Sequence, residues 1–137
     1  MNRVFQHYNG TVEALIGAQF STVKCITISE DSDVILIWFH DQLSNNWFRI
    51  FIDDAYCGVD CYSKDLSSED LDEEVECKDH SPWFIRKTVS EATVKTLSAT
   101  QEIVLSIKFD FGECRLICKI RDDAYCEFIY GNKLEQI

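Results

Sequence analysis

The five-residue word Asp-Asp-Ala-Tyr-Cys occurs twice in this chain, at residues 53–57 and 122–126. The Val-Ile-Leu run at 34–36 precedes the Ile-Val-Leu run at 103–105 by the same 69 positions. Self-similarity of this kind defines the structural unit, so the chain is predicted to be an internal duplication with a unit of about 35 residues. The expected copies span about 22–57 and 93–126.

Each copy contains short runs of β-branched and aromatic residues separated by polar turns, a pattern typical of strands. Neighbouring strands with such short connections pair antiparallel, because parallel neighbours need a crossover of a dozen or more residues. Each copy is therefore predicted to be a β-meander. The expected strands are 22–29, 34–40, 47–52 and 56–62 in the first copy, and 93–99, 103–111, 113–121 and 125–130 in the second.

The predicted fold class is α+β and β-rich, with two related antiparallel meanders in a twisted sheet or a sandwich. One or two short helices are expected: residues 11–19 have apolar side chains at helical spacing. Residues 67–76 form either a short helix, with Leu71 and Val75 as its buried stripe, or a solvated loop. Trp83 to Val89 is expected to be an extra strand or short helix. With 46% hydrophobic residues, residues 1–137 form a single domain in which 58–80 is an acidic connection.

The seven cysteines and the lack of a signal peptide or membrane span favour a soluble, cytoplasmic protein. An odd number of cysteines without an export signal indicates free buried thiols rather than a disulfide framework. We therefore expect Cys25, Cys57 and Cys126 to act as small hydrophobic residues.

Charge is the strongest indication of function. The formal net charge is −11. Residues 58–80 hold nine acidic and two basic residues, whereas residues 81–137 hold eight of each. A negative field repels phosphate backbones and anionic lipids, which argues against nucleic-acid or membrane binding. A basic protein partner is attracted instead.

Metal binding and cofactor binding are not predicted. Two Cys-x3-Cys pairs, 57/61 and 114/118, lie in expected strands, where positions four apart are separated by about 13 Å, too far to share an ion. The repeated Asp-Asp pairs could bind a cation or basic side chains, but the composition of the word is better explained as a turn. No glycine-rich phosphate loop is present.

No catalytic residues are predicted. The histidines, His7, His40 and His80, lie outside any recognisable nucleophile or acid-base motif. His40-Asp41 and Asp79-His80 are sequence neighbours, and neighbours in a strand point to opposite faces. The chain is therefore expected not to be an enzyme.

The predicted interaction surface is a docking face built from the acidic connection, whose alternative is a solvated charge run. Tryptophans near an acidic rim are typical anchors of protein interfaces. The candidate protein-binding residues are Asp65, Glu69, Asp70, Asp72, Glu73, Glu74, Glu76, Trp47 and Trp83.

The progression from Leu15-Ile16-Gly17 and Val23 through residues 34–36 and Phe39 to Arg49-Ile50 and Asp60 resembles a pattern found in small bacterial domains. In size, acidity and β-rich layout the chain is similar to immunity proteins of contact-dependent and other polymorphic toxin systems. The resemblance implies a non-enzymatic antidote that covers the active or substrate-binding face of a cognate toxin, for example a basic nuclease. It transfers no site residues.

Two alternatives stay open. An acidic mimic of nucleic acid would inhibit a DNA- or RNA-binding protein, but its carboxylates should spread over the whole surface, and residues 81–137 are neutral. A small ligand-binding protein or an enzyme without a recognisable motif would need a concave pocket with convergent polar groups.

Overall fold

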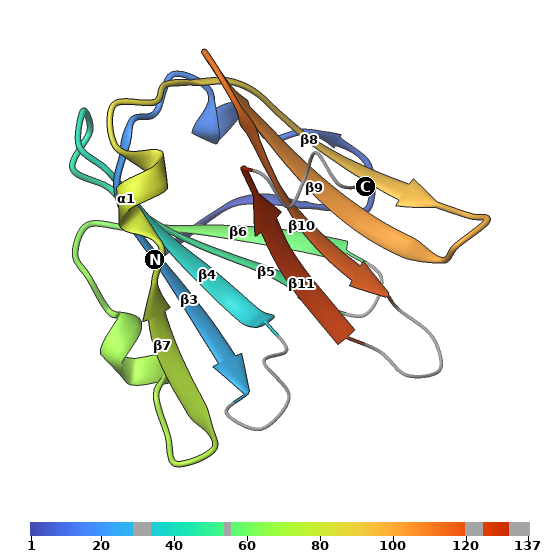
Figure 1. The fold of residues 1–137 in the computed structure, drawn as a ribbon, viewed down its shortest axis with the longest axis horizontal. Helices are drawn as coiled ribbons and strands as arrows, with labels where there is room; N and C mark the ends of the chain where they lie inside the picture. The colour runs from blue at the N-terminus through green and yellow to red at the C-terminus, as the bar shows by residue number, and fades with distance from the viewer. Residues whose placement is uncertain (29–33, 54–55, 120–124, 132–137) are drawn as a thin grey trace.

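The structure, a computed structural model, describes residues 1–28, 34–53, 56–119 and 125–131. Two antiparallel sheets pack face to face (Figure 1). Sheet A has the strand order β1-β6-β5-β4-β3-β7, and sheet B has the order β11-β10-β9-β8-β2. The elements are β1 (Asn2–His7), β2 (Gly10–Thr11), η1 (Glu13–Leu15), β3 (Phe20–Ile28), β4 (Val34–Asp41), β5 (Trp47–Asp53), β6 (Tyr56–Tyr62), η2 (Ser67–Asp70), β7 (Val75–Asp79), α1 (Ser81–Phe84), β8 (Val89–Leu97), β9 (Glu102–Phe109), β10 (Glu113–Lys119) and β11 (Tyr125–Tyr130).

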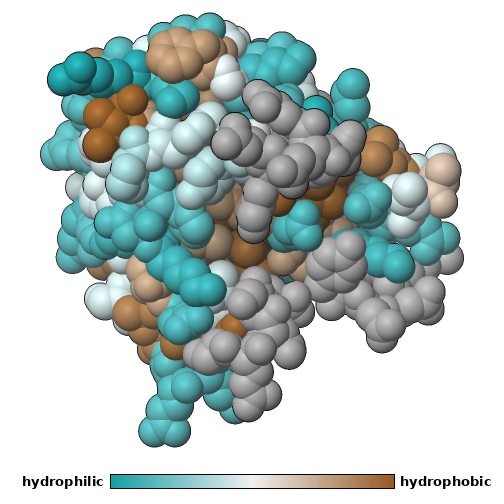
Figure 2. Space-filling model, viewed as in Figure 1, coloured by the Kyte–Doolittle hydropathy of each residue, from teal (hydrophilic) through white to brown (hydrophobic). Residues whose placement is uncertain are grey.

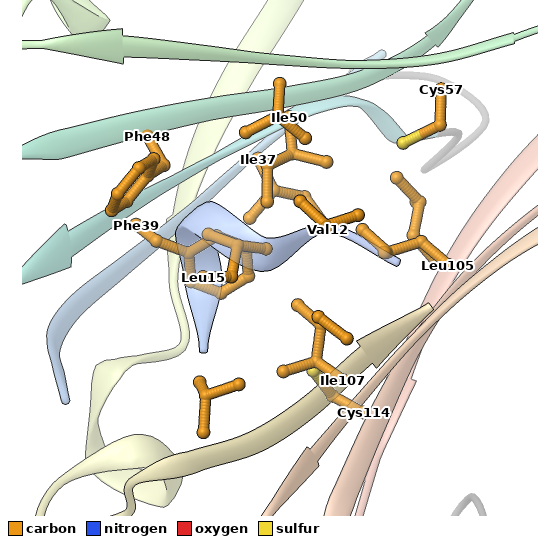
Figure 3. Packing of buried hydrophobic residues seen from close by; sticks show 14 of the residues in the cluster. Val12, Leu15, Ile37, Phe39, Phe48, Ile50, Cys57, Leu105, Ile107 and Cys114 are labelled. Carbon is orange, nitrogen blue, oxygen red and sulfur yellow. The ribbon is translucent and has the colours of Figure 1, made fainter. Parts of the chain in front are cut away.

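A central core fills the space between the sheets (Figure 3). Ile37 and Ile50 of sheet A face Leu105 and Ile107 of sheet B, and Leu15 of η1 lies between them. Side chains alternate between buried and partly exposed along β9 and β10, the period of two that a half-buried strand requires. The predicted β-rich class and its two antiparallel meanders are confirmed, and the sandwich is the form they take.

The two meanders have the same strand order. β3-β4-β5-β6 and β8-β9-β10-β11 each run as consecutive antiparallel neighbours. Each is preceded by a short edge strand that pairs with the other meander. β2 precedes the first meander and pairs with β8, whereas β7 precedes the second meander and pairs with β3. The two halves of the chain are therefore intertwined by exchanged edge strands.

Backbone hydrogen bonds repeat in the same exchanged way. The Val12 amide donates to the Ala92 carbonyl, and the His80 amide donates to the Val23 carbonyl, both at 2.8 Å. A bridge between Gln19 and Thr88, which are 69 positions apart, joins the starts of β3 and β8. The arrangement that recurs thus contains an edge strand, a short helix and a meander, more than the unit of about 35 residues predicted from the repeated word. An origin by gene duplication stays a prediction.

Residues 34–36 and 103–105 match in sequence but are not structurally equivalent at every position. Val34 and Ile103 both belong to the central core, but Leu36 lies on the outer face of sheet A whereas Leu105 is in the central core. The register between β3 and β4 shifts at Ile26, which leaves one extra residue in β4. A one-residue shift turns every following side chain to the opposite face.

Several sequence predictions need correction. The helix expected at 11–19 is one turn, η1, followed by Gly17 at φ +87°. β1, β2 and β7 were not predicted. Residues 54–55 and 122–124 of the repeated word lie outside the described residues. Within the described part of the chain, no helix is long and apolar enough to cross a membrane.

Candidate functional site

A row of residues in register crosses the outer face of sheet A. Arg3 of β1 pairs with Asp60 of β6, which pairs with Arg49 of β5. The row continues through Trp38 of β4 to Lys24 of β3. We call these five residues the transverse row. Because residues in register share one face of the sheet, five strands bring three basic side chains, one carboxylate and one indole together.

Asp60 is the most buried charged member of the transverse row, with 2% exposure. The Arg3 guanidinium forms a hydrogen-bonded ion pair with it, and Arg49 Nη1 lies 3.7 Å from its other oxygen. The hydrogen bond to Asp60 raises the pKa of Arg3. A buried carboxylate is tolerated only with such partners, so both arginines are structural.

The transverse row also holds the acidic segment, residues 65–76, on the sheet. Asp70 accepts hydrogen bonds from Arg49 Nε at 3.2 Å and Nη2 at 3.1 Å, and from Trp38 Nε1 at 2.8 Å. Leu66 packs against Trp38 in an outer cluster on this face. Asp70 is therefore an anchor of the segment and not a free carboxylate.

Asp65 forms the second anchor. Lys24 Nζ donates to it at 2.6 Å, and the Ser67 amide and hydroxyl donate at 2.9 and 2.6 Å. Burial alone would raise the pKa of Asp65, but the hydrogen bonds from Lys24 and Ser67 outweigh it, so the pKa is lowered. The segment is thus fixed at two points 5 residues apart in sequence.

The remaining acids of the segment face solvent. Glu69, Asp72, Glu73 and Glu74 are exposed, and Glu76 is exposed beside Lys78 Nζ at 3.5 Å. They surround the turn before β7, which forms the projecting end at the lower left of Figure 1 and the hydrophilic projection in Figure 2. The seven predicted carboxylates therefore separate into two that are paired with Lys24 or Arg49 of the sheet and five that face solvent.

A helix over 67–76 does not form. Only η2 is helical, Leu71 is 44% exposed, and Val75 begins strand β7. The expected buried stripe of Leu71 and Val75 is therefore wrong. Anchoring of Asp65 and Asp70 to the sheet shapes the segment, where a helix would have needed an apolar stripe.

The two predicted tryptophans lie in different places. Trp47 packs in the outer cluster, with its ring centroid 4.7 Å from that of His40 and 5.2 Å from Lys24 Nζ. Trp47 thus shares Lys24 with the acidic segment. Trp83 of α1 packs against the central core and the ring of Tyr130. Trp83 is not part of the surface that the acidic segment forms.

Sequence reasoning missed a hydrogen-bond chain beside Trp47. Ser21 Oγ lies 2.5 Å from His40 Nδ1, and His40 Nε2 lies 2.8 Å from Asn45 Oδ1. If Nε2 carries the proton and donates it to Asn45, Nδ1 is free to accept from Ser21. The pairing of β3 with β4 places Thr22 opposite His40 and leaves Ser21 in a bulge. No sequence motif predicts this bulge.

The cysteines contain one disulfide, between Cys118 and Cys126, so the expectation that Cys126 is a free thiol is wrong. The hairpin register of β10 and β11 places these two directly opposite each other. Burial raises the pKa of Cys25 and of Cys57 to about 12, which suits their predicted role as small hydrophobic residues. Among the described residues, no group of three or more His, Cys, Asp or Glu could hold a metal ion.

We expect the protein to lose stability in acid through Asp41 and Asp65. Burial alone would raise the pKa of Asp41, but hydrogen bonds from Ser44 and from the Gln19 and Leu43 amides outweigh it, so the pKa is lowered. Asp41 and Asp65 therefore both titrate below the value of about 3.9 that an aspartate has in the unfolded chain. Their contribution is present above that value and is lost as pH falls through the folded pKa. Urea unfolding measured from pH 7 to pH 2.5 should therefore show that the free energy of unfolding falls below about pH 5. In the double variant Asp41→Asn with Asp65→Asn, the free energy of unfolding should depend less steeply on pH. An equally steep curve in the double variant would contradict this assignment.

No protein-family model matches the chain, and neither a curated protein nor a solved structure matches it. Fold and site define it as an antiparallel β-sandwich of two intertwined meanders, with an anchored acidic segment on the outer face of one sheet.

Proposed function

We propose that this chain is a non-enzymatic, cytoplasmic immunity protein that neutralises a basic toxin domain, such as a nuclease, by covering its active or substrate-binding face. The observation that carries the proposal is a set of five solvent-facing carboxylates on a segment that two ion pairs to sheet A hold in place. The net charge of −11 supports the same class of partner.

Anchoring matters because an ordered segment loses little conformational entropy when it binds. Asp65 and Asp70 supply the attachment, which leaves Glu69, Glu73 and Glu74 to face a partner. A concentrated negative potential opposite a basic surface accelerates association by orders of magnitude at low salt and weakens as salt screens it. Trp47, half-buried beside Lys24, is the apolar anchor at the edge of this surface.

Charge reversal in the acidic segment should weaken binding of the partner strongly. With Glu73→Lys, Glu74→Lys and Glu76→Lys combined, we expect a loss of at least about 100-fold in affinity for the protein that co-purifies with the wild-type chain, mainly through slower association. The control triple Glu13→Lys, Glu91→Lys and Glu102→Lys makes the same change in net charge away from the segment.

The functional criterion is neutralisation. The captured protein should arrest growth when expressed alone, and co-expression of the wild-type chain or the control triple should restore growth, whereas the Glu73/Glu74/Glu76 variant should not. If both triple variants protected the cells equally, the acidic segment would not be part of the interface with the toxin. A captured protein without toxicity would contradict the immunity role itself.

A second candidate function has one specific observation in its favour, the Ser21–His40–Asn45 chain. In an acyl-transfer reaction, Ser21 Oγ would attack the carbonyl of an ester while His40 Nδ1 takes its proton and passes it to the departing alkoxide. Water would then release the acyl group from Ser21. This candidate predicts that a fluorophosphonate probe labels the wild-type chain but neither Ser21→Ala nor His40→Ala. An unlabelled wild-type chain, with a known serine hydrolase labelled in parallel, would exclude it.

A further inference from the structure

The exchanged arrangement of the two halves leaves one sheet edge different from its counterpart. β6 and β11 are the last strands of the two meanders. The outer edge of β6 is covered by β1, which pairs with it antiparallel from Asn2 opposite Cys61 to His7 opposite Cys57. Within the described ranges, no strand pairs with the outer edge of β11.

The reason for the difference lies in the residues before each exchanged edge strand. In the first half, β1 precedes β2 and returns to sheet A. In the second half, the stretch at the matching distance before β7 is the acidic segment, which Arg49 and Lys24 hold on the outer face of sheet A. In the second half, the counterpart of β1 thus contributes to the acidic surface, and among the described residues no strand covers β11.

The geometry of β11 indicates which of its backbone groups face outward. Cys118 and Cys126 lie opposite each other with Cα atoms 4.1 Å apart. That short distance is typical of a non-hydrogen-bonded antiparallel pair, whose amides and carbonyls point away from each other. By alternation, the amides of Cys126, Phe128 and Tyr130 point to the open edge.

The side chains of β11 do not protect that edge. Natural edge strands are kept from pairing by charges, proline, bulges or very short length. β7 carries Glu76, Lys78 and Asp79, and β2 has only 2 residues. β11 has the sequence Tyr-Cys-Glu-Phe-Ile-Tyr, strongly β-forming with Glu127 as its single charge.

We propose that β11 pairs antiparallel with β11 of a second copy, so that sheet B continues across a two-fold dimer. A second copy is favoured over a basic partner because Glu127 is the single charge of β11, so this edge offers a basic partner little attraction, whereas a two-fold axis lets the same strand edge serve both copies. Pairing Phe128 with Phe128 of the partner subunit keeps the two copies of Glu127 from facing each other directly. The acidic segment stays free, so this dimer does not depend on the proposed immunity function.

The test combines sedimentation with residue-resolved hydrogen exchange of the whole wild-type chain over a concentration series. We expect a monomer–dimer equilibrium in which the amides of Cys126, Phe128 and Tyr130 become at least about 10-fold more protected as dimer forms, while the amides of the β7 edge do not change. Protection that is independent of concentration, a chain that stays monomeric at millimolar concentration, or a dimer that protects β7 instead would each overturn the proposal.

A matched pair of charge-neutralising variants tests the register. Glu127→Gln removes the repulsion between two Glu127 side chains that lie diagonally across the two-fold axis. We therefore expect the dissociation constant of its dimer to be several-fold lower than that of the wild-type dimer. Glu102→Gln, on β9 away from the edge, should leave dissociation unchanged. Equal effects of the two variants would contradict pairing through β11.

Discussion

Phe39→Ala should lower the free energy of unfolding by about 3 to 5 kcal/mol, a large part of the 5 to 15 kcal/mol typical of a domain. Phe39 has 0% exposure. Its ring stacks on Phe20 of the neighbouring strand at 4.3 Å and meets Phe84 of α1 and Phe128 of sheet B edge to face. Truncation leaves a cavity where α1 and both sheets meet, because three rigid neighbouring rings cannot collapse into the space. Urea unfolding monitored by far-UV circular dichroism measures the change.

Phe111→Ala is the matched control for Phe39→Ala. It deletes the same atoms, but Phe111 is 63% exposed and is contacted by Lys87 Nζ 5.0 Å from its ring centroid. We expect a loss below about 1 kcal/mol, as for an exposed cation–π contact. A cost at Phe39 as small as that at Phe111 would contradict the face-to-face packing of the two sheets.

Arg49→Ala should cost about 2 to 4 kcal/mol, because it leaves two carboxylates short of a partner. Among the described residues, Asp60 then keeps only Arg3 as a partner, and Asp70 keeps only Trp38 Nε1. Loss of the Asp70 anchor should also loosen the acidic segment over Trp38, which is 1% exposed. We therefore expect a second signal: a red shift of tryptophan emission under native conditions and faster exchange of the Glu69 and Leu71 amides, whose carbonyl partners belong to the same segment.

Lys108→Ala is the control for Arg49→Ala. Lys108 pairs with Glu91 at 3.7 Å, and both side chains are more than half exposed. Removal of such a surface pair should change stability by less than about 1 kcal/mol and leave tryptophan emission unchanged. If Arg49→Ala behaved like Lys108→Ala, the transverse row would not be what holds the segment.

The meander strands could be predicted because their own residues carry the signal. β9 and β10 carry an apolar side chain at every second position, as a sheet with one buried face requires. β1 and β7 have almost wholly exposed patterns, since they complete sheet A mainly through backbone pairing at its two edges. An edge strand held by backbone hydrogen bonds leaves little trace in hydrophobic periodicity, so these strands were missed.

The candidate site was predictable in composition but not in pairing. Clustering of carboxylates at 58–80 is visible in the sequence. The separation of Asp65 and Asp70 from Glu73 and Glu74 depends on Lys24 and Arg49, which lie 41 and 21 positions away from their partners. Such partners are set by strand order and register, which local sequence does not specify.

The chain's own residues determined the β-rich class, the two meanders and the concentration of negative charge, because each of these follows from local propensity or from composition. Only the tertiary structure decided that the edge strands are exchanged, that Cys126 is paired with Cys118, and which acids remain at the surface. Those features depend on contacts between residues far apart in the chain, and a one-residue change of register, such as the one in β4, is enough to change which side chains meet.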